Sequence, residues 1–539
     1  MKSLKRKLAS LLLVFAFLIS GCTNLSPVVD ENYDFYMGHV IIPYSDMEYV
    51  RPDEKEMERY FNNACDTAKR DADFTSLVQS INDFYDVYET FITNYNMAYI
   101  EYCCDMTDEY WQEEYEYCAT YAVTVQTYFN ELCYALAESQ FREQLETDEY
   151  FGADFFDAYD EDYLIDPEYT DMLEKEAELL NQYYELSEEA SSGAYYSDTY
   201  YETYATPLLE IYIDLVQLRQ DIAEYAGYSN YTEYAYNVTY YRDYIPAQVE
   251  EYLEKVSELF ADDYYRLCNS NIWANVSQYC SEADTLGYLE EVTKAMGDTF
   301  QAGYKALTVG KLYNIAYDDS KYQVSYETYL WDYTEPFIYM CPYLNQTDKL
   351  TLAHEFGHFM NDYVCVGSGA GIDVAEIHSQ AFEYLSLCYV EDAEDLAKYK
   401  MASSLCTYVE TGAYAMFEHE VYKLSDEELT VENLLAIYEE VGTKFGFNAR
   451  QWDKREIINI PHFFIQPMYM ISYVVSNDLA MQFYQLELEE KGTGLSLYEE
   501  CLYSQDTFLV DFAKNYELES PFKKGRLEEV AEVFESVLD

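Results

Sequence analysis

Residues 354–358 read His-Glu-Phe-Gly-His, a pattern that can bind a metal ion and activate water. On a helix, positions four apart share a face, so His354 and His358 can point at one ion. Two imidazole nitrogens supply half of a tetrahedral zinc site, and Glu355 beside them can take a proton from water. So short a motif also occurs by chance. Five of the six histidines lie between residues 354 and 462, which favours one Zn²⁺ site.

A zinc hydrolase needs a third protein ligand and keeps its fourth position for water. A longer histidine motif would place that ligand at residue 364, but valine stands there. Three glycines within residues 367–371 predict a turn, after which a second helix can return a carboxylate. We therefore predict Glu376, the carboxylate nearer the turn, as the third ligand. Glu383, seven residues later on the same face, is predicted to orient a ligand histidine through its other ring nitrogen.

Other residues near the motif leave alternatives open. Asp362 could replace Glu383 in orienting a histidine, and Glu376 could be an ordinary solvated carboxylate. His378 is interpreted as a neighbour of the ligands or a substrate contact rather than a ligand. A zinc–thiolate site with Cys365 or Cys388 is conceivable, although Glu376 explains the metal better.

These residues resemble the M3 peptidases, the family of thimet oligopeptidase and oligoendopeptidase F. Members of the family contain, in this order, segments similar to Thr-Leu-x-His-Glu-x-Gly-His, a glycine-bearing loop and Glu-x-x-Ser-x-x-x-Glu. In this chain the corresponding residues are 351–358, 367–371 and 376–383. Residues 336–340 resemble the family strand that lies beside the bound peptide. The resemblance implies that this strand pairs with the substrate backbone through Phe337, Ile338, Tyr339 and Met340.

A second segment, residues 460–464, reads Ile-Pro-His-Phe-Phe and resembles the family segment before a tyrosine-bearing helix. The resemblance implies that His462 and Tyr469, with Tyr473 as a second candidate, bind substrate and stabilise the tetrahedral oxyanion. A one-residue shift near Pro467 leaves open which tyrosine faces the oxyanion.

Long helices must position these residues. Between Pro52 and Gly152 there is neither glycine nor proline, which predicts several long helices joined by polar turns. Residues 322–326 and 337–340 are the best strand candidates. We predict a mainly α fold with a small β element beside the zinc helix. The resemblance, which covers roughly residues 200–535, adds a deep channel between two helical halves. The predicted parts are an N-terminal helical region, 46–200, and a catalytic domain, 201–539.

The formal net charge of −70 makes nucleic acid an improbable partner, because phosphate binding needs basic patches. The many carboxylates are interpreted as a solvated surface that keeps the protein soluble. An acidic cleft that attracts cationic peptides is the alternative. The 64 tyrosines lie in nearly every predicted helix, which indicates core and half-buried positions rather than one aromatic site.

The N-terminus carries a targeting pattern. Four basic residues precede an apolar run, 8–19, that is too short for a membrane span and leads into Gly21-Cys22. This pattern resembles the lipobox of bacterial lipoproteins. We predict a signal peptide at 1–21, lipidation of Cys22, a tether at 22–45 and a cell-membrane location outside the cytoplasm. An ordinary secretory signal is the alternative. Disulfides are permitted in an exported chain, but the cysteine spacing assigns none.

Together these features predict a zinc peptidase that cuts internal bonds of short peptides. Water activated by the metal would attack the scissile carbonyl while Glu355 carries the proton to the leaving amine. Two alternatives remain: an M3-type carboxypeptidase or peptidyl-dipeptidase, and a peptide-binding lipoprotein without catalytic activity. End-blocked peptides distinguish the first alternative, because an exopeptidase must hold a free terminus.

Overall fold

The structure, a computed structural model, describes most of the chain. The described residues are 40–70, 73–147, 150–151, 155–159, 166–191, 198–268, 270–365, 367, 370–447, 452–504 and 506–538. The predicted signal peptide, Cys22 and most of the predicted tether lie outside the described residues, so lipidation stays a prediction. Over the described part of the chain, none of the helices is long and apolar enough to cross a membrane.

The chain divides into two units. The first comprises Met1–Ala177, Lys305–Cys341 and Asp362–Gly369, and the second comprises Glu178–Tyr304, Pro342–Asn361 and Ala370–Asp539. Three helices begin in one unit and end in the other: α7 (Pro167–Ser191), α13 (Asp298–Gly310) and α14 (Asp348–Cys365). The predicted boundaries at residues 45 and 200 stay predictions.

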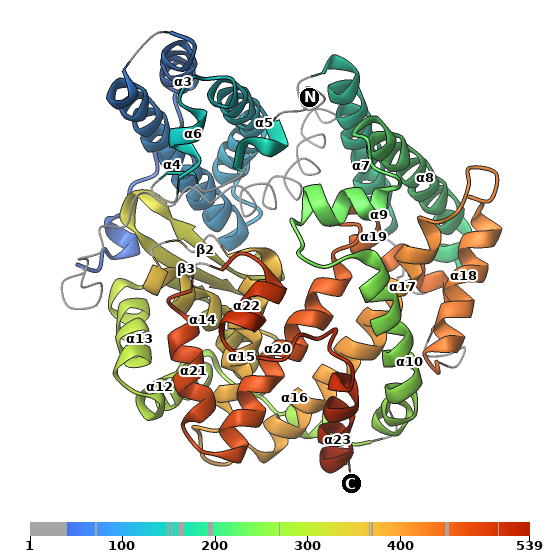
Figure 1. The fold of residues 1–539 in the computed structure, drawn as a ribbon. Helices are drawn as coiled ribbons and strands as arrows, with labels where there is room; N and C mark the ends of the chain where they lie inside the picture. Colours follow the sequence, from blue (N-terminus) through green and yellow to red (C-terminus); the bar gives the residue numbers. More distant parts are fainter. Residues whose placement is uncertain are drawn as a thin grey trace. The chain divides into compact units, whose positions relative to one another are not determined.

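The first unit is built on three helices of residues 54–137 that pack together (Figure 1). The stretch without glycine or proline forms α3 (Glu54–Lys69), α4 (Phe74–Cys104), α5 (Glu109–Ala137) and α6 (Arg142–Leu145). Buried apolar residues recur at three- and four-residue spacing, such as Leu77, Ile81, Phe84, Tyr88 and Phe91 on α4. Aspartates at the N-caps, Asp73 and Asp108, accept backbone N–H bonds and so fix where these helices begin. The helical elements of this unit are η1 (Tyr44–Asp46), α3 (Glu54–Lys69), α4 (Phe74–Cys104), α5 (Glu109–Ala137), α6 (Arg142–Leu145) and η2 (Phe155–Tyr159).

A three-stranded sheet belongs to the same unit. Its order is β1 (Tyr313–Ile315), β3 (Glu335–Met340), β2 (Ser325–Leu330), with β1 parallel and β2 antiparallel to β3. A short 3₁₀ turn, η5 (Trp331–Tyr333), joins β2 to β3. The predicted strand at 337–340 is present. The other begins at Ser325 instead of residue 322, because Tyr322 pairs its backbone N–H with Cys103 instead of a strand.

The regular elements among the described residues of the second unit are helices, apart from an isolated antiparallel bridge between Tyr279 and Asn345. Its central helix, α15, is buried along nearly its whole length and packs against α20 (Figure 1). The mainly α prediction is confirmed. The helical elements are α8 (Asp198–Tyr225), α9 (Tyr231–Tyr234), η4 (Ala235–Thr239), α10 (Pro246–Cys268), α11 (Ile272–Val276), α12 (Glu282–Met296), α15 (Ile372–Ser386), α16 (Glu394–Cys406), η6 (Thr407–Thr411), α17 (Gly412–Val421), α18 (Val431–Lys444), η7 (Lys454–Asn459), α19 (Pro461–Ile465), α20 (Met470–Glu489), α21 (Thr493–Cys501), α22 (Leu509–Asn515) and α23 (Arg526–Leu538).

Candidate metal centre and active site

Three predicted ligands come together in the second unit. His354 and His358 lie one turn apart on α14, with ring centroids 5.1 Å apart, and Glu376 faces them from α15. One donor atom from each of the three lies within 4.8 Å of the other two. Glu376 is only 7% exposed, which excludes a solvated surface carboxylate. Two imidazole nitrogens and one carboxylate oxygen at these separations fit a zinc ion with an open fourth position.

A glycine inside the motif brings the two ligand-bearing helices into contact. A Cβ placed on Gly357 would lie 2.6 Å from the backbone oxygen of His378 and 2.6 Å from the Cα of Ser379. No side chain fits there, so α14 and α15 touch backbone to backbone at this point. The contact sets the distance across which Glu376 reaches the two histidines.

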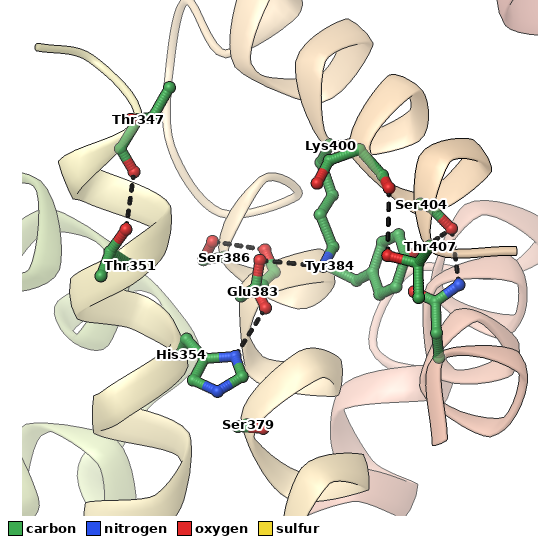
Figure 2. Close-up of polar contacts among 12 residues, drawn as sticks. Thr347, Thr351, His354, Ser379, Glu383, Tyr384, Ser386, Lys400, Ser404 and Thr407 are labelled. Atoms are coloured by element: carbon green, nitrogen blue, oxygen red, sulfur yellow. Dashed lines mark hydrogen bonds and ion pairs between the residues drawn. The ribbon is translucent and has the colours of Figure 1, made fainter. Parts of the chain in front are cut away.

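The predicted orienting contact of Glu383 is present (Figure 2). Its Oε1 lies 2.9 Å from Nδ1 of His354, so that Nε2 is the nitrogen left facing Glu376, 3.5 Å from its Oε2. The other carboxylate oxygen of Glu383 accepts a 2.8 Å hydrogen bond from Nζ of Lys400 on α16. Ser379 lies one turn after Glu376, and its Oγ donates to that carboxylate at 3.1 Å.

The charges around His354 favour a cation. Burial lowers the pKa of His354, but the hydrogen bond to Glu383 and the charges of Glu376, Glu383 and Glu355 outweigh it and raise the pKa to about 9. Burial also acts on His358, and with the neighbouring His354 and His378 it holds that pKa well below its usual range. A site that attracts a proton to one imidazole and keeps the other neutral suits a divalent ion, which supplies the missing positive charge.

Glu355 has the environment of a general base. It is 6% exposed, and burial together with the charges of Glu376 and Glu383 raises its pKa to about 7, against the opposing effect of His354. A carboxylate whose pKa lies near neutral pH can both take and return a proton.

Three more predicted residues gather beside this centre. Tyr469 and Tyr473 have ring centroids 4.9 Å apart, and the His462 ring lies 5.9 Å from Tyr469 and 6.1 Å from Tyr473. The Tyr469 hydroxyl lies 3.5 Å from Oε1 of Glu376, whereas Tyr473 is half-buried one turn further along α20. Burial raises the pKa of both phenols, so both remain hydroxyl donors at neutral pH.

Sequence reasoning missed the residues that hold Tyr469 in place. Met468, the residue before it, has a left-handed backbone with φ of 67°. Its oxygen accepts a 2.9 Å bond from Arg242, and Tyr240 donates to the oxygen of Pro467 at 2.9 Å. The Arg242 guanidinium is buried over the rings of Tyr236 and Tyr240, at 4.5 and 4.4 Å from their centroids. No local pattern indicates these contacts, because they join residues more than 200 positions apart.

Glu418 forms a hydrogen bond to the same turn, and its ionisation makes the unfolding free energy depend on pH. It is fully buried, and its Oε1 accepts a 2.9 Å bond from the Met468 N–H. Burial raises its pKa to about 8, although this N–H and the charges of Arg219 and Arg242 oppose the shift. The folded protein therefore keeps a proton that the unfolded chain releases near pH 4.5. Consequently the unfolding free energy decreases as the pH rises through this window, on the order of a few kcal/mol.

We expect Glu418→Gln to remove this part of the pH dependence, because the amide keeps the acceptor oxygen but cannot ionise. The measurement is the urea-derived unfolding free energy at pH 5 and pH 9. Relative to the wild type, the variant should be more stable at pH 9 than at pH 5. Glu420→Gln, on the same helix with a side chain 46% exposed, is the control and should follow the wild type. Parallel pH dependences for Glu418→Gln and wild type would contradict the assignment.

Neither His378 nor a cysteine belongs to the donor group found among the described residues. His378 is 1% exposed, its ring lies 5.8 Å from that of Phe512, and burial lowers its pKa to about 3. The donor group found among the described residues contains no thiol, so the zinc–thiolate alternative gains no support. None of the twelve cysteines in the described part of the chain forms a disulfide.

The predicted pairing of β3 with substrate is wrong for residues 338–340. β3 is the central strand, and these residues pair with β1 on one side and with β2 on the other. Their backbone groups are therefore committed to the sheet. The side chains of Phe337, Ile338, Tyr339 and Met340 are at most 1% exposed. Their apolar character reflects burial on both faces of a central strand.

Comparisons with known proteins show what the chain is similar to. Residues 44–165 match the family described as Peptidase M3 N-terminal domain. An oligoendopeptidase F homologue from Borreliella burgdorferi is 26% identical over 217 residues, which cover 35% of this chain and 37% of that protein. The match thus spans well under half of the curated relative.

Solved structures share the fold over almost the whole chain. An oligoendopeptidase F from Bacillus anthracis strain Ames is 22% identical with a TM-score of 0.75, covering 93% of this chain and 98% of the other. PZ peptidase A is 19% identical with a TM-score of 0.78, covering 92% and 98%. At these identities the likeness establishes the fold.

Proposed function

We propose that this chain is an oligoendopeptidase F-like member of the M3 family and that it hydrolyses internal bonds of short peptides with one bound Zn²⁺. The observation that carries the proposal is the donor group of His354, His358 and Glu376, all within 4.8 Å, with Glu355 beside it. Carboxylate, imidazole and an adjacent buried base form the constellation of a metal-assisted hydrolase.

Each residue of the proposed site has a separate role in the reaction. When bound, Zn²⁺ supplies a Lewis acid that polarises the scissile carbonyl and makes water more acidic. Glu383 accepts the Nδ1–H of His354 and so keeps Nε2 available to the metal. Glu355 takes the proton of the attacking water and passes it to the leaving nitrogen. The hydroxyl of Tyr473 donates to the oxygen on which negative charge develops, with Tyr469 and His462 packed behind it.

Short peptides are the proposed substrates, because in the M3 family the site lies at the end of a channel that folded proteins cannot enter. The M3 carboxypeptidase or peptidyl-dipeptidase alternative requires a cation that holds the substrate's terminal carboxylate. Two buried cations of the same unit, Lys400 and Arg242, are committed to Glu383 and to the Met468 turn. That commitment favours internal cleavage.

Removal of the metal tests the proposal. We expect the wild-type chain to cut an internally quenched peptide of about ten residues, blocked at both ends, and to lose this activity on chelation. Added zinc should restore it, since the metal supplies the Lewis acid. The measurement is the rate of fluorescence increase beside the zinc content of the same sample. Cleavage of free-ended peptides only would indicate an exopeptidase, and peptide binding without cleavage would indicate a binding protein.

A further inference from the structure

A buried lysine lies behind the proposed metal site. Lys400, in the middle of α16, is 5% exposed, and its Nζ lies 2.8 Å from Oε2 of Glu383 (Figure 2). The ammonium also lies 4.5 Å above the ring of Tyr384, whose hydroxyl oxygen lies 2.7 Å from Oγ of Ser404 and 2.9 Å from Oδ1 of Asn477. Lysine is rarely this buried, since taking its charge out of water is costly without a partner.

The two oxygens of Glu383 have separate tasks. Oε1 contacts Nδ1 of His354 at 2.9 Å, and Oε2 contacts Lys400 at 2.8 Å, so the carboxylate is held at both ends. A carboxylate fixed in this way cannot rotate away from the imidazole without breaking a buried, charge-assisted hydrogen bond. The orientation of the His354 ring therefore depends on a residue from a third helix.

We propose that Lys400 is a positioning residue for metal binding. It acts through Glu383 to hold the His354 ring with Nε2 towards the metal. The inference rests on the proposed function, because it concerns the same metal site. Contacts one step behind a ligand typically contribute about 10- to 100-fold to metal affinity.

Removal of Lys400 changes zinc affinity in opposite directions depending on whether the lysine positions Glu383 or acts only through its charge. Lys400 is a cation close to a site for another cation, so its bare charge repels the metal. If charge were its only influence, removing it would tighten zinc binding. If it positions Glu383 and His354, removing it weakens zinc binding despite the lost repulsion.

Zinc affinity of Lys400→Met tests the inference. The probe is Zn²⁺ alone, titrated in competition with a fluorescent chelator, on the full chain. Because Lys400 acts through Glu383, we expect a dissociation constant that is higher than for the wild type by up to the about 10- to 100-fold that loss of the Glu383 contact itself would cause. Lys398→Met is the matched control: this lysine is on the same helix, its side chain is 43% exposed, and it pairs with Glu394 on the surface. Unchanged or tighter zinc binding by Lys400→Met would overturn the inference.

A mutant cycle shows whether Lys400 acts through Glu383. In a Glu383→Gln background, Lys400→Met should cause little further loss of affinity, because its partner is already neutral. Equal losses in both backgrounds would also overturn the inference. Circular dichroism checks folding, and Lys400→Gln, which keeps a donor near Glu383, replaces the methionine variant if that variant does not fold. If the wild type binds no zinc, the proposed function itself fails, which is a separate outcome.

Discussion

Replacing Glu355 with glutamine is expected to lower kcat by about 10²- to 10⁴-fold, the usual contribution of a general base. The amide has nearly the size of the carboxylate and keeps one acceptor oxygen, but it cannot take a proton from water. Because Glu355 lies outside the donor group of His354, His358 and Glu376, the zinc content should stay unchanged. The measurement is kcat on the end-blocked quenched peptide, with zinc determined in the same preparation.

Glu394→Gln provides the control for this experiment, because that side chain is 81% exposed on α16 and pairs only with Lys398 among the contacts described. It should retain wild-type kcat. A Glu355→Gln variant that keeps zinc and cuts at the wild-type rate would show that another group carries the proton.

Replacing Tyr473 with phenylalanine is expected to lower kcat by about 10²- to 10³-fold with little change in KM, as for loss of one oxyanion donor. Two observations favour Tyr473 over Tyr469. Tyr473 is half-buried, whereas Tyr469 is 4% exposed and its hydroxyl faces Oε1 of Glu376 at 3.5 Å. Tyr469 thus has a carboxylate to hold, and Tyr473 is the more exposed of the two side chains.

The companion variant Tyr469→Phe separates the two roles. It should act mainly through Glu376, so we expect weaker zinc binding and a smaller loss of kcat once zinc is saturating. Both variants need kcat and the zinc dissociation constant measured on the same samples. The reverse order, with the larger saturated kcat loss in Tyr469→Phe, would assign the oxyanion contact to Tyr469.

Local spacing explains why so much of the candidate site could be predicted. His354 and His358 meet because a helix repeats every 3.6 residues, and this holds wherever the helix lies. Glu376 and Glu383 required one more step, a turn followed by an antiparallel helix, and the glycines supplied that signal. The mainly α fold followed from a long stretch without glycine or proline, which became α3, α4, α5 and α6.

Contacts between distant segments could not be predicted in the same way. Lys400 meets Glu383 only because α16 follows α15 at a particular angle, and Arg242 meets Met468 across 226 positions. In a chain with 102 acidic residues, the sequence around one lysine or arginine does not indicate that its side chain is buried. The apolar run at 337–340 predicted a strand, but not that it would be the central strand with both edges paired.

The backbone contact at Gly357 has a consequence for motion. Since α14 and α15 touch without an intervening side chain, we expect the segments that carry His354, His358 and Glu376 to move together. A slow rearrangement that admits a peptide would carry the whole ligand set along and leave its internal distances unchanged. The ion would then leave only through rotation of individual side chains.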